Sequence, residues 1–244
     1  MERSLPYFAP RRRVGRWRKG TQGGARRTEA KRKMSQVALS AGEIFVVDDD
    51  PAVRDVLASL FTRDGFQVMN FADGASLLAS ARARTPVCII LDVNIPGRSG
   101  LDILKELNAQ DYPAPIFIMS GQGDIPMAVE AIKNGALDFI EKPFRGSGVV
   151  AQVREAMEAY TRRAADANAS KTGSFHFPGR EPLTRREQDV LAHIVAGASS
   201  KEAGRQLAIS PRTIEVHRSR IMEKLGAKNA ADLVRIVYDE GRSQ

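Results

Sequence analysis

The sequence predicts an α/β protein in which five β-α units form a doubly wound parallel sheet and a small all-helical domain follows. Between residues 43 and 163, short apolar segments alternate with segments whose apolar residues recur at helical spacing. Within them, Val87–Leu91 is an unbroken apolar run, typical of a strand buried on both faces of a parallel sheet. After residue 183 the periodicity is helical throughout, and 244 residues are enough for two small domains.

The elements of the first domain follow from this alternation. The expected strands cover residues 44–47, 66–71, 87–92, 116–119 and 137–140. The expected helices cover residues 51–65, 76–84, 101–107, 126–134 and 148–163. Pro51 stands at a helix-start position, and Gly135 ends the fourth helix. We therefore place the first domain at residues 43–163 and a linker, poor in periodic apolar residues, at 164–182.

Helix-capping signals divide residues 183–244 into four helices. Thr184 with Glu187, and Ser199 with Glu202, form capping boxes at the starts of the first two. In the third helix Ser210 is the cap and Pro211 the first residue, and Asn229 with Asp232 opens the fourth. The second and third helices, joined by a tight turn, predict a helix-turn-helix. A bundle of amphipathic helices that serves only for protein interaction is the alternative.

Charge is distributed unevenly along the chain. Residues 1–33 contain twelve Lys and Arg against Glu2 and Glu29, a net charge of +10. The net charge is −5 over residues 44–146, from nine basic and fourteen acidic residues, and +2 over residues 181–244, from eleven and nine. The basic character of the chain therefore comes from its N-terminal segment, and it does not make the whole chain a basic nucleic-acid binder.

Residues 1–42 are expected to be a disordered basic extension, because they lack apolar periodicity. Such a segment could be an arm that adds non-specific DNA affinity, a stretch upstream of a true start at Met34, or an organelle transit peptide. The single cysteine, Cys88, excludes an internal disulfide and is expected in the core. The sequence contains no run of 18 apolar residues, so no membrane span is predicted and a cytoplasmic protein is expected.

Charged or hydroxyl side chains follow four of the expected strands at the point where each strand ends. They are Asp48 and Asp49, Asp92, Ser120 and Lys142. The carboxyl ends of these strands meet at one edge of the sheet, so we expect the side chains to lie close together. Clustered carboxylates repel unless a cation is present, and Mg²⁺ prefers oxygen ligands. The set fits an aspartate nucleophile that takes up a phosphoryl group, whereas Asp92 alone could simply cap a helix.

These residues, in this order, resemble a response-regulator receiver domain over residues 43–146. Pro96 and Gly100 in the loop after Asp92, and the segments Gly-Asp-Ile-Pro-Met-Ala-Val-Glu-Ala and Asp-Phe-Ile-Glu-Lys-Pro-Phe, resemble the FixJ type. The resemblance implies a flavodoxin-like fold with Asp92 as the phosphoacceptor. It also implies the remaining roles: metal ligation by Asp48, Asp49, Asp92 and the backbone carbonyl of Asn94, a switch pair of Ser120 and Phe139, and phosphoryl contact by Lys142. For Phe139, a role in the core alone is the alternative.

Residues 183–244 are similar to the LuxR/NarL-type DNA-binding domain. The similarity covers Leu-Thr-x-Arg-Glu at the start, Leu-x-Ile-Ser-x-x-Thr-Ile-x-x-His before and in the third helix, and Lys-Leu-Gly at its end. On that helix Ile214, Ile221 and Leu225 are expected to face the core, and Glu215, Val216 and Ser219 to be exposed where side chains reach base edges. The candidate DNA contacts are Lys201, Arg212, Thr213, Glu215, Val216, Arg218, Ser219, Arg220 and Lys224.

Together the two resemblances imply a DNA-binding transcriptional regulator and not an enzyme. The implied partners are a sensor histidine kinase, Mg²⁺, promoter DNA, RNA polymerase and, after phosphorylation, a second copy of the chain. Dimerisation would use the face formed by residues 126–134 and 137–140. Two alternatives remain: a phosphotransfer sink that does not act at promoters, and a protein that binds DNA independently of phosphorylation.

Overall fold

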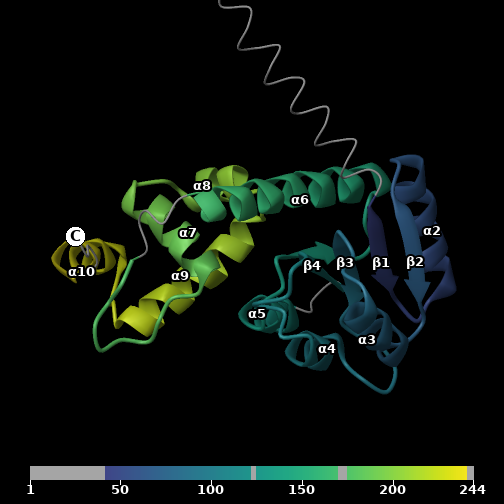
Figure 1. Cartoon of the computed structure of the whole chain (residues 1–244). Helices are drawn as coiled ribbons and strands as arrows, with labels where there is room; N and C mark the ends of the chain where they lie inside the picture. The colour runs from purple at the N-terminus through teal and green to yellow at the C-terminus, as the bar shows by residue number, and fades with distance from the viewer. Residues whose placement is uncertain (1–41, 122–124, 170–174, 241–244) are drawn as a thin grey trace, which may run out of the picture. The chain divides into compact units, whose positions relative to one another are not determined.

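A computed structural model describes residues 42–121, 125–169 and 175–240. The five strands are β1 (Glu43–Val47), β2 (Gln67–Phe71), β3 (Cys88–Asp92), β4 (Ile116–Ser120) and β5 (Asp138–Glu141). They form one parallel sheet in the order β2-β1-β3-β4-β5 (Figure 1). The predicted doubly wound α/β class is confirmed. The expected disordered extension over residues 1–42 lies outside the described residues, except for Gly42.

Helices cover both faces of this sheet. They are α2 (Pro51–Arg63), α3 (Gly74–Ala83), α4 (Gly100–Glu106), α5 (Ile125–Lys133) and α6 (Gly146–Ala169). Ile44 and Val46 of β1 pack in the apolar cluster that α2 and α6 cover, whereas Phe45 and Val47 pack in the cluster that α3, α4 and α5 cover. Side chains that alternate between two buried clusters explain why these strands carry no polar alternation.

Apart from shifts of one or two residues at the ends of several elements, two features of this domain differ from the prediction. Helix α6 runs to Ala169, so the predicted linker at 164–182 begins inside a helix. Residues 164–169 lack periodic apolar residues, but four of the six are alanine, the strongest helix former. Val56 matches the apolar spacing of α2, yet it is 50% exposed, because it lies one position off the stripe formed by the buried Leu57 and Phe61.

The second domain contains four helices, α7 (Arg185–Val195), α8 (Ser200–Leu207), α9 (Pro211–Leu225) and α10 (Ala230–Glu240). Both predicted capping boxes are present, and the Ser210 hydroxyl accepts a hydrogen bond from the backbone N–H of Thr213 at 3.1 Å. Helix α8 is capped at its C-terminus by Ala208, whose φ of 52° is left-handed, and this sets the tight turn into α9. The predicted helix-turn-helix is therefore formed by α8 and α9.

Gly204 in α8 lies against the start of α9. A Cβ atom there would approach the backbone oxygen of Ile209 to 2.8 Å. Glycine weakens an isolated helix by up to about 1 kcal/mol, but here it allows the two helices to come close. Among the described residues, no helix is both long and apolar enough to cross a membrane.

Candidate functional site

The acidic site lies at the carboxyl ends of neighbouring strands of the sheet. Asp48 directly follows β1, and Asp92 is the last residue of β3, which pairs with β1. Ser120 ends β4, and its backbone oxygen accepts a 2.7 Å hydrogen bond from the N–H of Lys142, just after β5. The register of four parallel strands thus brings residues from distant parts of the chain to one edge of the sheet.

Three carboxylates converge at this edge. One oxygen each of Asp48, Asp49 and Asp92 lies within 4.8 Å of the other two. The ammonium nitrogen of Lys142 is 2.7 Å from Oδ2 of Asp48 and 3.0 Å from Oδ1 of Asp92. Asp48 and Asp92 are buried, whereas Asp49 is exposed. An all-oxygen set that opens to solvent through one carboxylate suits a hard divalent cation such as Mg²⁺.

Electrostatics at the site reflect this burial. Burial raises the pKa of the Asp92 carboxyl above its ordinary value, and the hydrogen bond from Lys142 only partly opposes the rise. Burial lowers the pKa of Lys142, but the hydrogen bonds to Asp48 and Asp92 outweigh it and leave that pKa raised. Lys142 is therefore firmly protonated, and it is the cation that allows two buried carboxylates to lie side by side.

Gly100 explains how the loop after Asp92 packs. A Cβ atom at Gly100 would come within 2.5 Å of the backbone oxygen of Asp92, and the N–H of Gly100 donates to the Val93 oxygen at 2.9 Å. Any side chain here would push the start of α4 away from the end of β3. The glycine thus keeps the loop closed against the strand that carries Asp92.

The other residues predicted for this site are Ser120, Phe139 and Asn94. Ser120 is buried at the end of β4, next to the strand of Asp92. Phe139 is half-buried in the middle of β5, and the guanidinium carbon of Arg212 lies 5.6 Å from the centre of its ring. Asn94 is exposed in the loop after Asp92, and its role as a ligand stays a prediction.

Arg54 was missed by the sequence reasoning. Its Nη1 donates to the backbone oxygens of Asp48, at 2.6 Å, and Asp49, at 2.9 Å. The available signal was an arginine in the first turn of the helix that follows the acidic loop. Side chains at strand ends do not identify it, because Arg54 contacts the backbone behind them.

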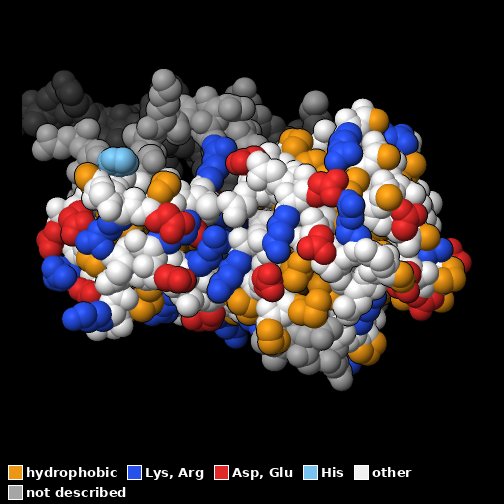
Figure 2. All heavy atoms as spheres, turned by 90° about the horizontal axis from the view of Figure 1, so that it is seen from below, with side chains coloured by type: hydrophobic (Ala, Val, Ile, Leu, Met, Phe, Trp, Pro, Cys, Tyr) orange, Lys and Arg blue, Asp and Glu red, His pale blue; other side chains and the backbone are white. Residues whose placement is uncertain are grey.

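The candidate DNA contacts on α8 and α9 do not form a uniformly exposed surface. Lys201, Glu215 and Ser219 are exposed, and Arg212 and Arg218 are half-buried. Thr213 and Val216 are buried, so the expectation of an exposed Val216 is wrong for this conformation. Over the face shown in Figure 2, basic and acidic side chains lie interspersed and do not form separate fields.

Two of the candidate cations are engaged by a buried acid. Lys224, 7% exposed, lies 3.0 Å from the carboxylate of Glu187, which is fully buried in α7, and Nε of Arg220 lies 3.5 Å from the other Glu187 oxygen. The same Glu187 carboxylate accepts from the Thr184 N–H in the capping box at 2.8 Å. Lys224 therefore links α9 to α7, a structural role that its place beside the recognition residues did not reveal.

Thr213 and Val216 are buried by contacts with the first domain, and the described residues of the two domains form one compact unit. The Asp138 carboxylate accepts hydrogen bonds from the Ser210 N–H at 2.8 Å and from the Thr213 hydroxyl at 2.5 Å. Val216 packs in the apolar cluster that contains Ala131 of α5. Burial raises the pKa of Asp138, and the hydrogen bonds from Thr213 and Ser210 oppose the rise.

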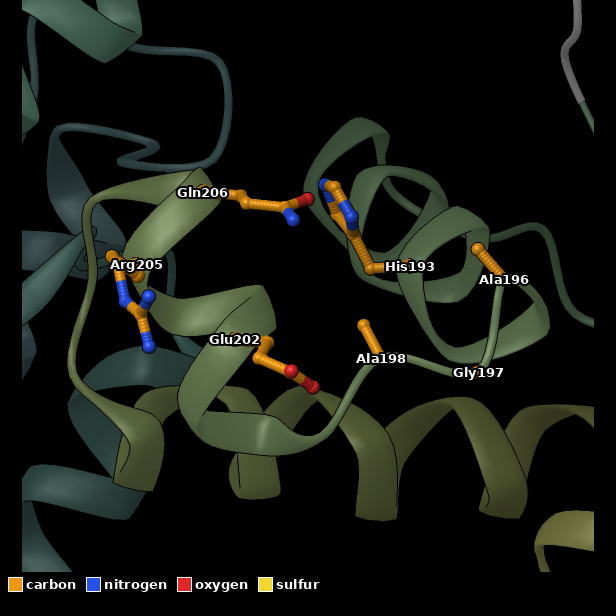
Figure 3. A pocket seen from close by; sticks show the side chains of 7 residues that line it. All are labelled: His193, Ala196, Gly197, Ala198, Glu202, Arg205 and Gln206. Carbon is orange, nitrogen blue, oxygen red and sulfur yellow. The ribbon is translucent and has the colours of Figure 1, made fainter.

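A hollow of about 420 Å³ lies between α7 and α8 of the second domain (Figure 3). None of Asp48, Asp49 and Asp92 lines it. His193 and Gln206 point toward each other across it, and Glu202 lines its floor. Glu202 is occupied as the acid of a capping box, since its Oε2 accepts from the N–H and the hydroxyl of Ser199. The one acid that lines this hollow therefore already serves as a helix cap, and we assign no ligand to the hollow.

Comparisons with known proteins agree with the division of the chain into two domains. Residues 44–154 match the response regulator receiver domain, and residues 181–237 match the luxR family of bacterial regulatory proteins. A protein with this domain order is a transcriptional response regulator of a two-component system. The chain belongs to the FixJ/NarL family of these regulators.

Three relatives illustrate the similarity. Over 201 residues the chain is 40% identical to the transcriptional regulatory protein FixJ of Bradyrhizobium diazoefficiens, covering 82% of this chain and 96% of that protein. It is 38% identical to the response regulator protein TodT of Pseudomonas putida, covering 80% and 85%. The crystal structure of NtrX from Brucella abortus matches with a TM-score of 0.51 at 30% identity, over 64% of this chain and 35% of that one.

Proposed function

We propose that residues 43–163 receive a phosphoryl group on Asp92 from a sensor histidine kinase, and that residues 183–244 bind promoter DNA in response. The observation that carries the proposal is the convergence of the Asp48, Asp49 and Asp92 oxygens within 4.8 Å, with Lys142 bridging two of them. Dimerisation through α5 and β5, contact with RNA polymerase and a cytoplasmic location belong to the same proposal, supported by the family of the chain.

The chemistry follows from the groups in place. A carboxylate oxygen of Asp92 attacks phosphorus, the bond from phosphorus to the donor's histidine nitrogen breaks, and the freed imidazole takes a proton from solvent. Lys142, already 3.0 Å from Oδ1 of Asp92, can transfer hydrogen bonds to the incoming phosphoryl oxygens. The hydroxyl of Ser120 is a further donor at the same edge of the sheet.

Metal binding would involve Asp48, Asp49, Asp92 and the backbone carbonyl of Asn94. The donor set fits, because three carboxylate oxygens lie together and one of the acids is exposed to solvent. Mg²⁺ bound there would offset the negative charge of the carboxylates and of the phosphoryl group. Without it, only Lys142 among the described residues is placed to offset that charge at Asp48 and Asp92.

Phosphorylation is tested by uptake of label from a small phosphodonor. The wild-type protein should take up label in the presence of Mg²⁺ and none when the metal is chelated beforehand, and Asp92→Asn should take up none in either condition. Asp55→Asn, which changes an exposed acid on α2, is the matched control and should behave like wild type. Label on the Asp92→Asn variant would show that the nucleophile is misassigned.

DNA binding is tested separately with genomic fragments in a gel-shift assay, with and without the phosphodonor. Affinity that rises with phosphorylation supports the regulator. Affinity that does not change would favour a constitutive DNA-binding protein. Absence of binding in both states would favour the phosphotransfer sink.

A further inference from the structure

Arg54 donates hydrogen bonds to the backbone behind the acidic site. Its Nη1 lies 2.6 Å from the backbone oxygen of Asp48 and 2.9 Å from that of Asp49, the two acids that follow β1. Although Asp49, Asp50 and Asp55 are close to it in sequence, no salt bridge joins Arg54 to an acid within the described part of the chain. The guanidinium is thus used to hold two peptide groups and not to neutralise a carboxylate.

Other hydrogen bonds hold the same loop at further points. The N–H of Asp50 donates to the Asp48 carboxylate at 3.0 Å, and the N–H of Ala52 donates to the Asp50 carboxylate at 2.8 Å. These bonds fix Asp48 and Asp50 through their side chains. The Asp49 carboxylate receives no hydrogen bond from the described residues, so its direction depends on the backbone that Arg54 holds.

We propose that Arg54 is a positioning residue of the metal site: by holding the Asp48 and Asp49 carbonyls, it keeps the Asp49 carboxylate turned toward Asp48 and Asp92. This inference rests on the proposed function, because it assumes that these three acids bind Mg²⁺. An exposed aspartate that had to be reoriented at each binding event would lose side-chain and backbone entropy on binding, and Arg54 removes part of that cost beforehand.

The positive charge of Arg54 acts in the opposite direction. A guanidinium next to the acidic loop repels a divalent cation, so an arginine acting only through its charge would weaken Mg²⁺ binding. Removing the side chain should therefore tighten binding if charge dominates, and loosen it if positioning dominates. The sign of the change decides between the two, and no assumption about its size is needed.

The test measures Mg²⁺ affinity of the full-length, unphosphorylated protein by isothermal titration calorimetry. Arg54→Ala should weaken binding roughly tenfold, which is typical when a partner that orients a metal ligand is lost. Arg54→Gln removes the charge but keeps an N–H donor, and it should bind more tightly than Arg54→Ala. Arg63→Ala removes an exposed charge from the last turn of the same helix and should leave the affinity unchanged.

Hydrogen exchange gives a second readout that does not involve metal. In Arg54→Ala the amides of Asp50 and Ala52 should exchange faster, because the loop that holds them is released. Equal or tighter Mg²⁺ binding by Arg54→Ala, or equal binding in the Ala and Gln variants, overturns the role of Arg54. If the wild-type protein does not bind Mg²⁺, or Asp49→Asn binds it as well as wild type, the proposed metal site itself is wrong. Should Arg54→Ala fail to fold, Arg54→Met, which keeps the bulk of the side chain but has no N–H donor, replaces it and should bind Mg²⁺ more weakly than Arg54→Gln. Equal or tighter binding by Arg54→Met would refute the inference.

Discussion

Each domain contains a lysine that neutralises buried carboxylate, and the two lysines have different roles. Lys142 is 24% exposed and lies between Asp48 and Asp92 at the edge of the sheet. Lys224 is 7% exposed and lies against Glu187, an acid with no exposed surface. The first site opens to solvent through the exposed Asp49, whereas Glu187 is enclosed by its own helix cap and by α9.

The difference shows how placement decides what an ion pair does. At the carboxyl ends of parallel strands, the side chains point into the loop region where substrates reach the fold, so a lysine there can exchange one anionic partner for another. Between packed helices, the pair of Lys224 and Glu187 is almost closed to solvent and joins α9 to α7. Breaking each pair in turn tests that distinction, and the enclosed pair should show the larger effect.

Removing the buried acid should have the largest effect. Glu187→Ala removes the buried acid that pairs with Lys224, leaving that ammonium with the exposed Glu181 and the Pro182 backbone oxygen, and it removes the acceptor for the Thr184 N–H. The free energy of unfolding of the helical domain should fall by about 3–5 kcal/mol, the usual cost of breaking a buried pair. Chemical denaturation followed by circular dichroism measures it.

Two controls accompany this variant. Glu181 lies 3.1 Å from the same Lys224 nitrogen but is 64% exposed, so Glu181→Ala should change stability little. The double variant Glu187→Leu/Lys224→Met should be more stable than Glu187→Ala, because it does not leave the buried Lys224 ammonium without its acid. A double variant as unstable as the single one would mean that the cost lies in packing and not in charge.

Acidification should have the next largest effect, through His217 on α9. This side chain is 5% exposed, and neither ring nitrogen has a hydrogen-bond partner in the described segments. Burial, with a smaller contribution from Arg220, lowers its pKa from 6.5 to about 4. Between these values the unfolded chain binds a proton that the folded chain does not, so stability falls as the pH drops from 6.5 toward 4.

The expected contribution of His217 is about 3 kcal/mol over that interval, at 1.36 kcal/mol per pKa unit. Denaturation of the helical domain at a series of pH values measures it. His217→Leu should flatten the pH dependence, and His176→Gln, at an exposed histidine, should retain it. An unchanged slope in His217→Leu would assign the pH dependence to other groups.

Lys142→Ala should show the exchange of partners that distinguishes the open site. Without Mg²⁺ the melting temperature should fall, corresponding to a loss of about 1–3 kcal/mol, because Asp48 and Asp92 lose a charged hydrogen-bond donor. Added Mg²⁺ should restore most of it, whereas the same addition should not restore Glu187→Ala. Equal responses of the two variants to Mg²⁺ would remove the distinction between the open and the enclosed site.

The sequence was sufficient to predict the sheet and the acidic site because both depend on local patterns. Unbroken apolar runs locate buried strands, and parallel topology then brings the residues after them to one edge, as found for Asp48, Asp92 and Lys142. Helix capping is equally local, which is why the boxes at Thr184 and Ser199 were found.

What could not be predicted depends on contacts between segments far apart in the chain. The pairing of Lys224 with Glu187 joins residues 37 positions apart. In the sequence, a lysine of α9 that pairs with a buried acid looks the same as a lysine that contacts a DNA phosphate. The burial of Thr213 similarly requires Asp138, 75 positions away. Arg54 acts through backbone oxygens, which every residue has, so no side-chain pattern identifies its partners.

The smallest expected effect concerns Asp138, whose carboxylate accepts from the Ser210 N–H and the Thr213 hydroxyl. Asp138→Ala removes both bonds, each worth about 1 kcal/mol, while the Ser210 hydroxyl still caps α9. The amides of α9 should exchange faster, and the unphosphorylated protein should bind DNA up to about tenfold more tightly in a gel shift. Asp138→Asn keeps one acceptor and should give a smaller change, and Asp55→Ala should give none. Removing an acceptor that protects amides should make those amides exchange faster. If hydrogen exchange around Thr213 and Val216 is the same in Asp138→Ala and wild type, the Asp138 contact does not protect α9 in solution.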